Sequence, residues 1–278
     1  DAVLVVDDGS TDKTAEAARD AGATVVEHSR NSGYGAALKT LFKEANDCEA
    51  DHLVVIDADG QHEPADIPLL VETQREHDME IVIGSRFETD AETDIPVYRR
   101  FGLKVVNILT NLSLGSLTPR SQISDTQSGF RAYDSTAIES IASDTSIGQG
   151  MNASTDILVH AKDQGYEVKE VGTDVYYDVA DANSHHPVRH GLTLVHNILT
   201  TVERRHPILL LGLPGITSIV VGVGFAFWAV QKHLRFGGLP YGLSITATFF
   251  TLTGVFACFT AIILHALQSQ LGNHDTDV

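Results

Sequence analysis

Basic residues are scarce in this chain of 278 residues, in which 19 lysines and arginines face 37 aspartates and glutamates. The formal net charge of −18 gives a surface that repels phosphate backbones, so the composition argues against a nucleic-acid-binding protein. Only seven of the basic residues are lysines. An acidic, lysine-poor surface is typical of a protein adapted to high salt, because concentrated salt screens the repulsion between exposed carboxylates. An ordinary acidic soluble protein is the alternative interpretation.

Cysteine is also rare, and its two copies lie in unlike surroundings. Cys48 lies in an acidic stretch and Cys258 inside an apolar run, so we expect no disulfide and a reducing compartment for the soluble part. The chain opens without a methionine or a signal peptide. Its first residues already have the pattern of a buried strand, from which we expect that part of a domain precedes residue 1.

The first 180 residues alternate short β-branched runs with helical stretches. The predicted strands are residues 2–6, 24–27, 52–56 and 80–83. The predicted helices between them are residues 11–21, with Ser10 or Thr11 as N-cap, residues 36–45, and a helix that follows Pro64 and ends near His77. This rhythm predicts an α/β fold with a mainly parallel sheet and helices on both faces. Ligands bind such sheets at the carboxyl ends of the strands.

Two stretches carry apolar residues at helical spacing next to basic residues, namely residues 97–117 and 190–205. They are either ordinary amphipathic helices packed on the core or helices that lie in a membrane interface. Asn111 of the first stretch also begins a glycosylation acceptor pattern, which is common by chance.

The composition changes after Pro207, where two long apolar runs begin. Residues 208–230 and 243–267 are each long enough to cross a bilayer, and together they predict a transmembrane helical hairpin. Arg189, Arg204 and Arg205 precede the first run, so a slight positive-inside bias favours a cytoplasmic soluble domain. The expected organisation is a catalytic domain over residues 1–187, an amphipathic juxtamembrane helix over 188–206, and two transmembrane helices within 207–278.

Acidic motifs close two of the predicted strands. Asp7-Asp8-Gly9-Ser10 ends the first strand, and Asp57-Ala58-Asp59-Gly60-Gln61 ends the strand at residues 52–56. Two carboxylates one residue apart can share a hard cation, so Asp57 and Asp59 predict a site for Mg²⁺ or Mn²⁺. An Asp-x-Asp alone is weak, since many are solvated turns, but its place after a buried strand favours a site.

Glycine turns and arginines follow other strands. The turn Arg30–Gly35 precedes a predicted helix, whose N-terminal amides could bind an anion, although a bland turn is the alternative. Leu38 breaks the G-x-G-x-x-G pattern, which disfavours a dinucleotide fold. Arg86 follows a strand and could bind phosphate, or form a surface ion pair. The segment Asp125–Arg131 combines a carboxylate, a glycine turn and an arginine.

Together these motifs resemble family 2 glycosyltransferases of the GT-A fold, in particular polyisoprenyl-phosphate hexosyltransferases similar to dolichyl-phosphate mannose or glucose synthases. The resemblance covers nearly the whole chain and implies a nucleotide-sugar-binding, Rossmann-like mixed sheet with a C-terminal transmembrane helical hairpin. It implies donor-binding roles for Asp7, Asp8, Asn31, Gly33, Asp57, Gln61 and Arg86, and metal binding by Asp57 and Asp59. It implies acceptor-binding roles for Ser128, Arg131 and Arg189, and catalytic roles for Asp59, Arg131 and Asp156.

This sequence departs from that family in two places. The family's first strand, with its Pro-x-Tyr-Asn-Glu segment, is absent from the sequence, and that segment helps to hold the nucleotide. The segment Asp181–Arg189 is less basic than its counterpart in the family. The resemblance implies inverting transfer of a hexose from GDP- or UDP-sugar to a polyisoprenyl phosphate. Because that acceptor is already ionised, the reaction needs cations and positioning more than a general base.

Three other classes of protein share part of these features. A processive polysaccharide synthase has a Gln-x-x-Arg-Trp signature, but the one tryptophan here, Trp228, lies in a predicted span. A nucleotidyltransferase also uses paired carboxylates, but no basic glycine-rich entry loop is visible. The third alternative is a non-catalytic membrane scaffold that retains the fold. The sequence leaves the sugar and the oligomeric state open.

Overall fold

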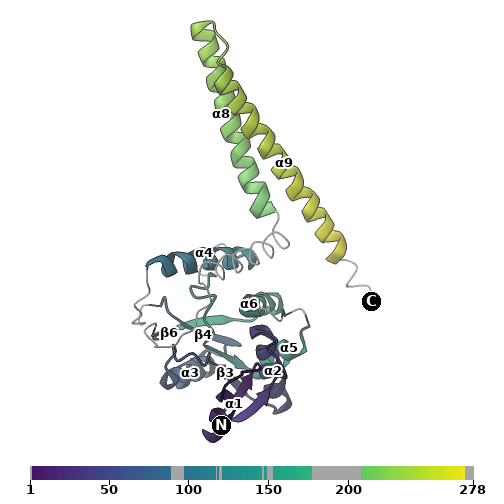
Figure 1. Cartoon of the computed structure of the whole chain (residues 1–278). Helices are drawn as coiled ribbons and strands as arrows, with labels where there is room; N and C mark the ends of the chain where they lie inside the picture. The colour runs from purple at the N-terminus through teal and green to yellow at the C-terminus, as the bar shows by residue number, and fades with distance from the viewer. Residues whose placement is uncertain are drawn as a thin grey trace. The chain divides into compact units, whose positions relative to one another are not determined.

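The computed structural model describes residues 2–88, 97–116, 118, 121–145, 147–148, 153–176 and 208–272. The chain divides into two compact units with a boundary between residues 198 and 199. All described residues up to 176 belong to the first unit, and residues 208–272 belong to the second (Figure 1). The predicted boundaries at residues 187 and 206, the helix at 190–205 and Arg189 lie outside the described residues.

The N-terminal part forms a small parallel sheet. Strand β1 (Leu4–Asp7) pairs with β2 (Thr24–Glu27), and α1 (Thr14–Asp20) connects them. The predicted strands match within two residues, but the predicted cap at Ser10 or Thr11 is wrong, because the helix begins only at Thr14. The amide of Ser10 instead donates to the Asp7 carboxylate at 2.7 Å, which keeps this segment in a turn.

A second sheet has the strand order β3-β5-β4-β6. Its strands are β3 (His52–Val55), β4 (Ile81–Ser85), β5 (Arg131–Asp134) and β6 (Val168–Gly172). Strand β5 runs antiparallel to both β3 and β4, whereas β4 and β6 are parallel. The expectation of a mainly parallel sheet is therefore wrong for this part, and the mixed sheet that the family resemblance implied is confirmed.

Helices cover both faces of the second sheet because the side chains of β4 alternate between two cores. On one face Ile81 and Ile83 pack with α2 (Tyr34–Asp47), α5 (Ser135–Ser143) and α6 (Ala153–Gln164). On the other face Val82 packs with Leu70 of α3 (Ile67–His77), which follows the short 3₁₀ turn η1 (Pro64–Asp66). All three β4 side chains are fully buried, so the strand stabilises both layers.

Helix α4 (Val97–Ser113) is the predicted amphipathic helix at residues 97–117, although it ends four residues earlier. Its side chains alternate between burial and exposure. Val106 and Thr110 are buried, whereas Ile108 is 57% exposed. An apolar side chain exposed on a helix that also carries Arg100 and Lys104 is compatible with contact to an amphipathic ligand or surface.

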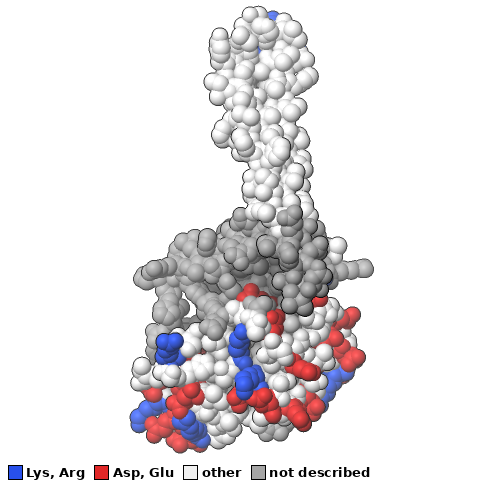
Figure 2. Space-filling model, turned by 90° about the vertical axis from the view of Figure 1, so that its right-hand side faces the viewer, with Lys and Arg blue, Asp and Glu red and all other residues white. Residues whose placement is uncertain are grey.

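The second unit is a helical hairpin. It consists of the π-helical turn η2 (Ile208–Gly212), α8 (Leu213–Phe236) and α9 (Tyr241–Gly272). Two spans, Leu210–Phe236 and Tyr241–Leu267, are long and apolar enough to cross a membrane. Only 17% of each window is buried, which argues against a soluble core helix pair. On the face drawn in Figure 2 the carboxylates gather on the first unit, and the hairpin surface is almost uncharged.

The two hairpin helices approach closely where small residues face each other. A methyl group at Gly222 would collide with Thr251, and one at Gly254 would collide with the backbone of Gly215. The hydroxyl of Ser218 donates to the carbonyl of Phe250 at 2.7 Å across the interface. Close backbone packing with an occasional polar link is how helices associate in lipid, so the contacts agree with the predicted hairpin.

Candidate active site

The first acidic motif is occupied by contacts within the protein. The carboxylate of Asp8, just past β1, accepts the amides of Ser32 at 2.9 Å and Gly33 at 2.7 Å. His28 Nδ1 lies 2.6 Å from the same carboxylate, and His28 Nε2 lies 2.8 Å from the Thr40 hydroxyl. Burial acts to raise the pKa of Asp8, but these hydrogen bonds outweigh it and lower the pKa. The anion that the glycine turn holds is therefore Asp8.

Gly9 makes this junction possible. Its φ of +78° is one that side chains rarely adopt, and a methyl group there would collide with the backbone of Arg30 and Asn31. Asn31 is exposed beside this contact, and the amide of Gly33 is already bonded to Asp8. Asp7 is 5% exposed. The donor-binding roles of these residues stay predictions, but the structure does bring the two segments together.

The second acidic motif is electrostatically strained. Asp57 is half-buried and Asp59 is exposed, both just past the end of β3. Burial and the charge of Asp59 raise the pKa of Asp57, and Arg131 and Arg86 act in the opposite direction. The backbone amide of Gln61 donates to Asp59 Oδ1 at 3.0 Å. A cation would relieve the repulsion between the two carboxylates.

The oxygen ligands of the second acidic motif suit a divalent cation that also binds a substrate. Asp57 and Asp59 offer hard oxygen ligands, which Mg²⁺ and Mn²⁺ prefer. Within the described residues no group of three or more His, Cys, Asp or Glu side chains could hold a metal ion. The protein would therefore supply two carboxylates, and phosphate and water would complete the shell, as is usual for Mg²⁺.

Three residues surround the Asp57 side chain. A methyl group at Gly129 would collide with the Asp57 carboxylate, so this glycine allows the close approach. Tyr34 is half-buried beside Asp57, and burial and then the Asp57 charge raise the pKa of Tyr34 to about 12. Arg131 adds a positive charge nearby. The sequence did not indicate the role of Tyr34.

Arg131 itself is buried at 2% exposure. Its Nη1 donates to the Ser154 carbonyl at 3.0 Å, and its Nη2 donates to the Thr126 carbonyl at 2.8 Å. Direct contact with an acceptor would require these carbonyls to release it. Arg131 therefore lies where it can balance the charge of Asp57, and its contact with an acceptor stays a prediction.

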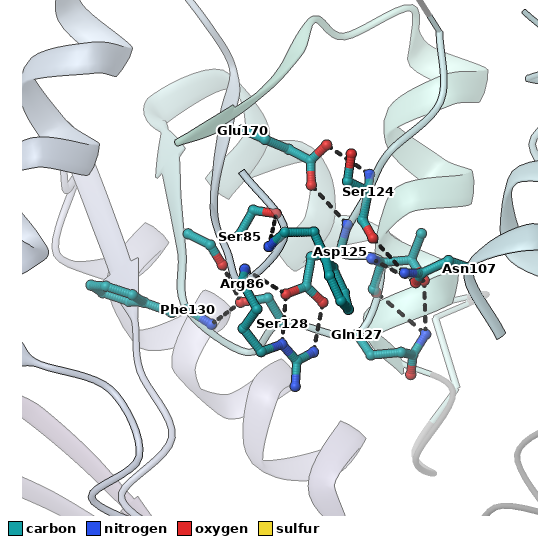
Figure 3. A network of polar contacts seen from close by, with 12 residues as sticks. Ser85, Arg86, Asn107, Ser124, Asp125, Gln127, Ser128, Phe130 and Glu170 are labelled. Carbon is teal, nitrogen blue, oxygen red and sulfur yellow. Dashed lines mark hydrogen bonds and ion pairs between the residues drawn. The ribbon is translucent and has the colours of Figure 1, made fainter. Parts of the chain in front are cut away.

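Arg86 forms a buried ion pair. Its Nε and Nη2 donate to the Asp125 carboxylate at 2.7 and 2.6 Å, and its backbone amide donates to the same group at 3.0 Å (Figure 3). The side chains are 12% and 0% exposed, so the pair is not at the surface. A forked, desolvated pair of this kind fixes the orientation of the guanidinium. The interpretation of Arg86 as half of a surface ion pair is wrong.

The other predicted site residues have defined places. The Ser128 hydroxyl is buried and donates to the Gly84 carbonyl at 2.6 Å, which ties it to the end of β4. Asp156 lies on α6, and its Oδ2 accepts the Gly148 amide at 3.0 Å. The acceptor-binding role of Ser128 and the catalytic role of Asp156 stay predictions. Ser128 in this position supports the backbone rather than presenting its hydroxyl to solvent.

His62 is a neighbour of the site that the sequence did not suggest. Its ring packs against Phe130 with centroids 5.2 Å apart, and its buried Nδ1 has no hydrogen-bond partner among the residues that the structure describes. Burial and then the charge of Arg86 lower its pKa, while Asp59 and Asp125 oppose this. Its position three residues after Asp59 was visible, but nothing in the local pattern distinguished it from a loop histidine.

A cleft of about 520 Å³ lies between α4 and the segment that follows it. Its lining combines basic, amide and apolar side chains: Phe87, Arg100, Lys104, Asn107, Ile108, Asn111, Leu112, Ser116, Gln122, Ile123 and Ser124. Phe87 directly follows Arg86 in the chain, so the cleft adjoins the ion pair. Asn111 is buried, and its side-chain amide exchanges two hydrogen bonds with the backbone of Ile123, so this asparagine forms part of the cleft wall.

Comparison with known proteins identifies the family. A profile described as glycosyl transferase family 2 matches residues 1–142. Glycosyltransferase AglJ of Haloferax volcanii is 29% identical over 232 residues, which cover 83% of this chain and 72% of the relative. UDP-N-acetylglucosamine–dolichyl-phosphate N-acetylglucosaminyltransferase of Methanococcus voltae is 27% identical over 195 residues, which cover 64% of this chain and 75% of the relative.

A solved structure shows the same fold. Glucosyl-3-phosphoglycerate synthase from Mycobacterium tuberculosis, in complex with Mn²⁺, UDP and glucosyl-3-phosphoglycerate, aligns with a TM-score of 0.51 at 19% sequence identity. The alignment covers 74% of this chain and 68% of that one. The likeness confirms the GT-A fold that the sequence motifs implied.

Proposed function

Because the chain belongs to glycosyl transferase family 2, we propose that this glycosyltransferase moves a hexose from a nucleotide-sugar to a polyisoprenyl phosphate of the dolichyl type. The observation that carries the proposal is the strained carboxylate pair Asp57/Asp59 beside the buried Arg86–Asp125 ion pair. Opposite charges arranged in this way suit a diphosphate bound through a cation.

The donor end consists of the acidic pair and Arg86. Asp57 and Asp59 would hold Mg²⁺ or Mn²⁺, and a bound cation would supply charge neutralisation for the leaving diphosphate. A related fold binds Mn²⁺ together with UDP, which supports a divalent ion and makes UDP-sugars the first donors to test, with GDP-sugars second. The Methanococcus relative is also named for a UDP-sugar and dolichyl phosphate.

The cleft beside α4 suits the acceptor. A polyisoprenyl phosphate has a charged head and an apolar tail, and the lining offers Arg100 and Lys104 together with Phe87, Ile108 and Leu112. The exposed basic groups can reach the phosphate, and the apolar side chains can cover the first isoprene units. Arg189, to which the family resemblance gives an acceptor-binding role, would contribute a further positive charge for the phosphate. Arg131 and Asp156 would act by holding the surrounding backbone and charge.

The reaction would be an inverting displacement. An acceptor phosphate oxygen attacks the anomeric carbon, the new carbon–oxygen bond forms on the face opposite the leaving group, and the bond to the nucleoside diphosphate breaks. The acceptor is largely dianionic near pH 7, so no strong base is needed to remove a proton. Arg86 stabilises the departing diphosphate, and the cleft holds the acceptor in line.

The apolar hairpin and the relatives that act on polyisoprenyl phosphates suggest a membrane location. We propose two membrane crossings with the catalytic unit on the cytoplasmic side, supported by the arginines before the first span. The acidic surface and the haloarchaeal relative support adaptation to high salt.

Labelling of lipid by membranes tests the proposal. Membranes from cells that express the full-length protein would be incubated with Mn²⁺ or Mg²⁺ and a panel of labelled UDP- and GDP-sugars. We expect label in a lipid fraction that mild acid releases as free sugar. Label that enters only polymer or protein would reject a lipid-phosphate acceptor, and absence of metal and donor binding would favour a scaffold.

A further inference from the structure

Glu170 lies on the strand next to the one that leads into Arg86. Strand β6 pairs in parallel with β4, with Glu170 opposite Ile83 and Gly172 opposite Ser85. Arg86 follows Ser85 directly, at the end of β4. The sheet register therefore places a carboxylate beside the site, although nothing in the sequence motifs pointed to it.

The Glu170 carboxylate accepts two successive backbone amides. Oε2 accepts the amide of Ser124 at 2.7 Å, and Oε1 accepts the amide of Asp125 at 2.8 Å (Figure 3). Burial raises the pKa of Glu170, and the two amides act against that rise. A half-buried carboxylate that accepts one amide on each oxygen defines both the distance and the rotation of the peptide that it holds.

Asp125 links Glu170 to Arg86. The backbone of Asp125 faces Glu170, and its fully buried side chain accepts Arg86 Nε and Nη2 at 2.7 and 2.6 Å. The three residues form a continuous chain from β6 through the turn to the end of β4 (Figure 3). A shift of the turn would move the Arg86 guanidinium with it.

Helix α4 holds the other side of the same turn. Asn107 Oδ1 accepts the Thr126 amide at 3.1 Å and the Thr126 hydroxyl at 2.6 Å, and its Nδ2 donates to the Ser124 carbonyl. These bonds join the turn to the cleft wall. Glu170 joins the same turn to the second sheet, in which β4 leads into Arg86. Loss of the Glu170 carboxylate would therefore release the side of the turn that faces Arg86.

We propose that Glu170 is a positioning residue for the transfer reaction: it fixes the Ser124–Asp125 peptide and thereby orients the Arg86 guanidinium toward the donor diphosphate. This rests on the proposed function, since it assumes that Arg86 serves the donor end. The charge of Arg86 does act on Asp57, which places it within range of the acidic pair. Glu170 contacts no substrate in this scheme.

Glu170→Gln tests the proposal with almost no change of shape. The new NH₂ group would face a backbone N–H, so one of the two amides would lose its acceptor. We expect kcat/KM for the nucleotide-sugar to fall about tenfold, and binding of UDP or GDP with Mn²⁺ to weaken by a similar factor. Glu167→Gln is the matched control, because Glu167 is exposed three residues earlier and should behave as wild type.

A double-mutant cycle separates positioning from a general structural effect. In an Arg86→Gln background, Glu170→Gln should change donor kinetics and diphosphate binding by less than about twofold, because the group that it orients is gone. Full additivity of the two changes would overturn the proposal. Glu170→Asp, which keeps the charge but retracts it, provides a second variant with an intermediate loss if Glu170→Gln unfolds the protein.

The two readouts keep this proposal distinct from the proposed function. If wild-type protein binds Mn²⁺ with UDP or GDP but labels no lipid, the acceptor assignment fails, and the binding data still decide the role of Glu170. If lipid is labelled but Glu170→Gln equals Glu167→Gln in both measurements, the role of Glu170 is overturned. A wild-type protein that binds neither nucleotide with Mn²⁺ overturns both.

Discussion

Two acidic motifs that look alike in the sequence have opposite electrostatics in the folded chain. Asp8, just past β1, is partly desolvated by burial, but His28 and two backbone amides outweigh that effect and lower its pKa. Asp57 past β3 meets burial and a second carboxylate, which raise its pKa. The first motif is satisfied by the protein, and the second has an unfavourable charge density that a cation can relieve. The same residue type at equivalent places therefore stabilises the fold in one region and is proposed to bind a cation in the other.

The largest expected effect is on transfer. Asp59→Asn should reduce metal-dependent labelling of lipid more than about a hundredfold, because it removes one of the two anionic ligands for the cation. Its thermal stability should stay at or slightly above that of wild type, because a repulsive charge is lost. Asp51→Asn, exposed before β3, is the control. Near-normal turnover by Asp59→Asn would contradict the proposal that Asp59 binds the metal ion.

The next effect is on stability, and it sharpens the contrast. Asp8→Asn should lower the free energy of unfolding by about 2–3 kcal/mol, because two amides and His28 lose a charged acceptor. The measurement is denaturant unfolding in detergent at a fixed salt concentration, with Asp20→Asn at the exposed end of α1 as control. If Asp8→Asn were as stable as Asp20→Asn, the carboxylate would have no structural role.

A substitution next to the Asp57/Asp59 carboxylates should weaken the binding of metal and nucleotide while leaving the fold intact. Gly129→Ala places a methyl group where the Asp57 carboxylate now lies. We expect Mn²⁺-nucleotide affinity to fall about tenfold, as for other disturbances of groups that orient a metal ligand. Gly102→Ala serves as the comparison, because its added methyl group would meet no described atom within 4 Å beyond its own stretch of helix. Equal affinities in the two variants would show that Asp57 tolerates displacement.

The smallest effect is a difference in pH dependence. Because the folded pKa of Asp8 lies below its ordinary value of 3.8, its contribution to stability is present above that value and is lost as the pH falls through the folded pKa. As the pH decreases from about 5 to 2, the free energy of unfolding should therefore fall more steeply for wild type than for Asp8→Asn. Parallel curves would contradict the lowered pKa.

Much of the first half of the chain was predictable because its signals are local. The strands at residues 24–27 and 52–56 and the helix ending near His77 follow from short apolar runs and their boundaries. Strand β5 was missed because Arg-Ala-Tyr-Asp has no β-branched pattern, and only burial between β3 and β4 makes it a strand. The cap of α1 was misplaced because Asp7 draws Ser10 into a turn.

The sequence by itself determined the family motifs, the acidic pair and the apolar hairpin, because each depends on neighbouring residues or on the length of a run. Only the tertiary structure decided what those groups contact. Asp8 finds its amide donors 24 and 25 residues away, and Glu170 finds its own 45 and 46 residues away. Such pairings depend on how the strands are ordered in space, and local spacing does not carry that information. For this reason the structure, and not the motif, distinguishes the carboxylate that holds the fold from the pair proposed to bind a cation.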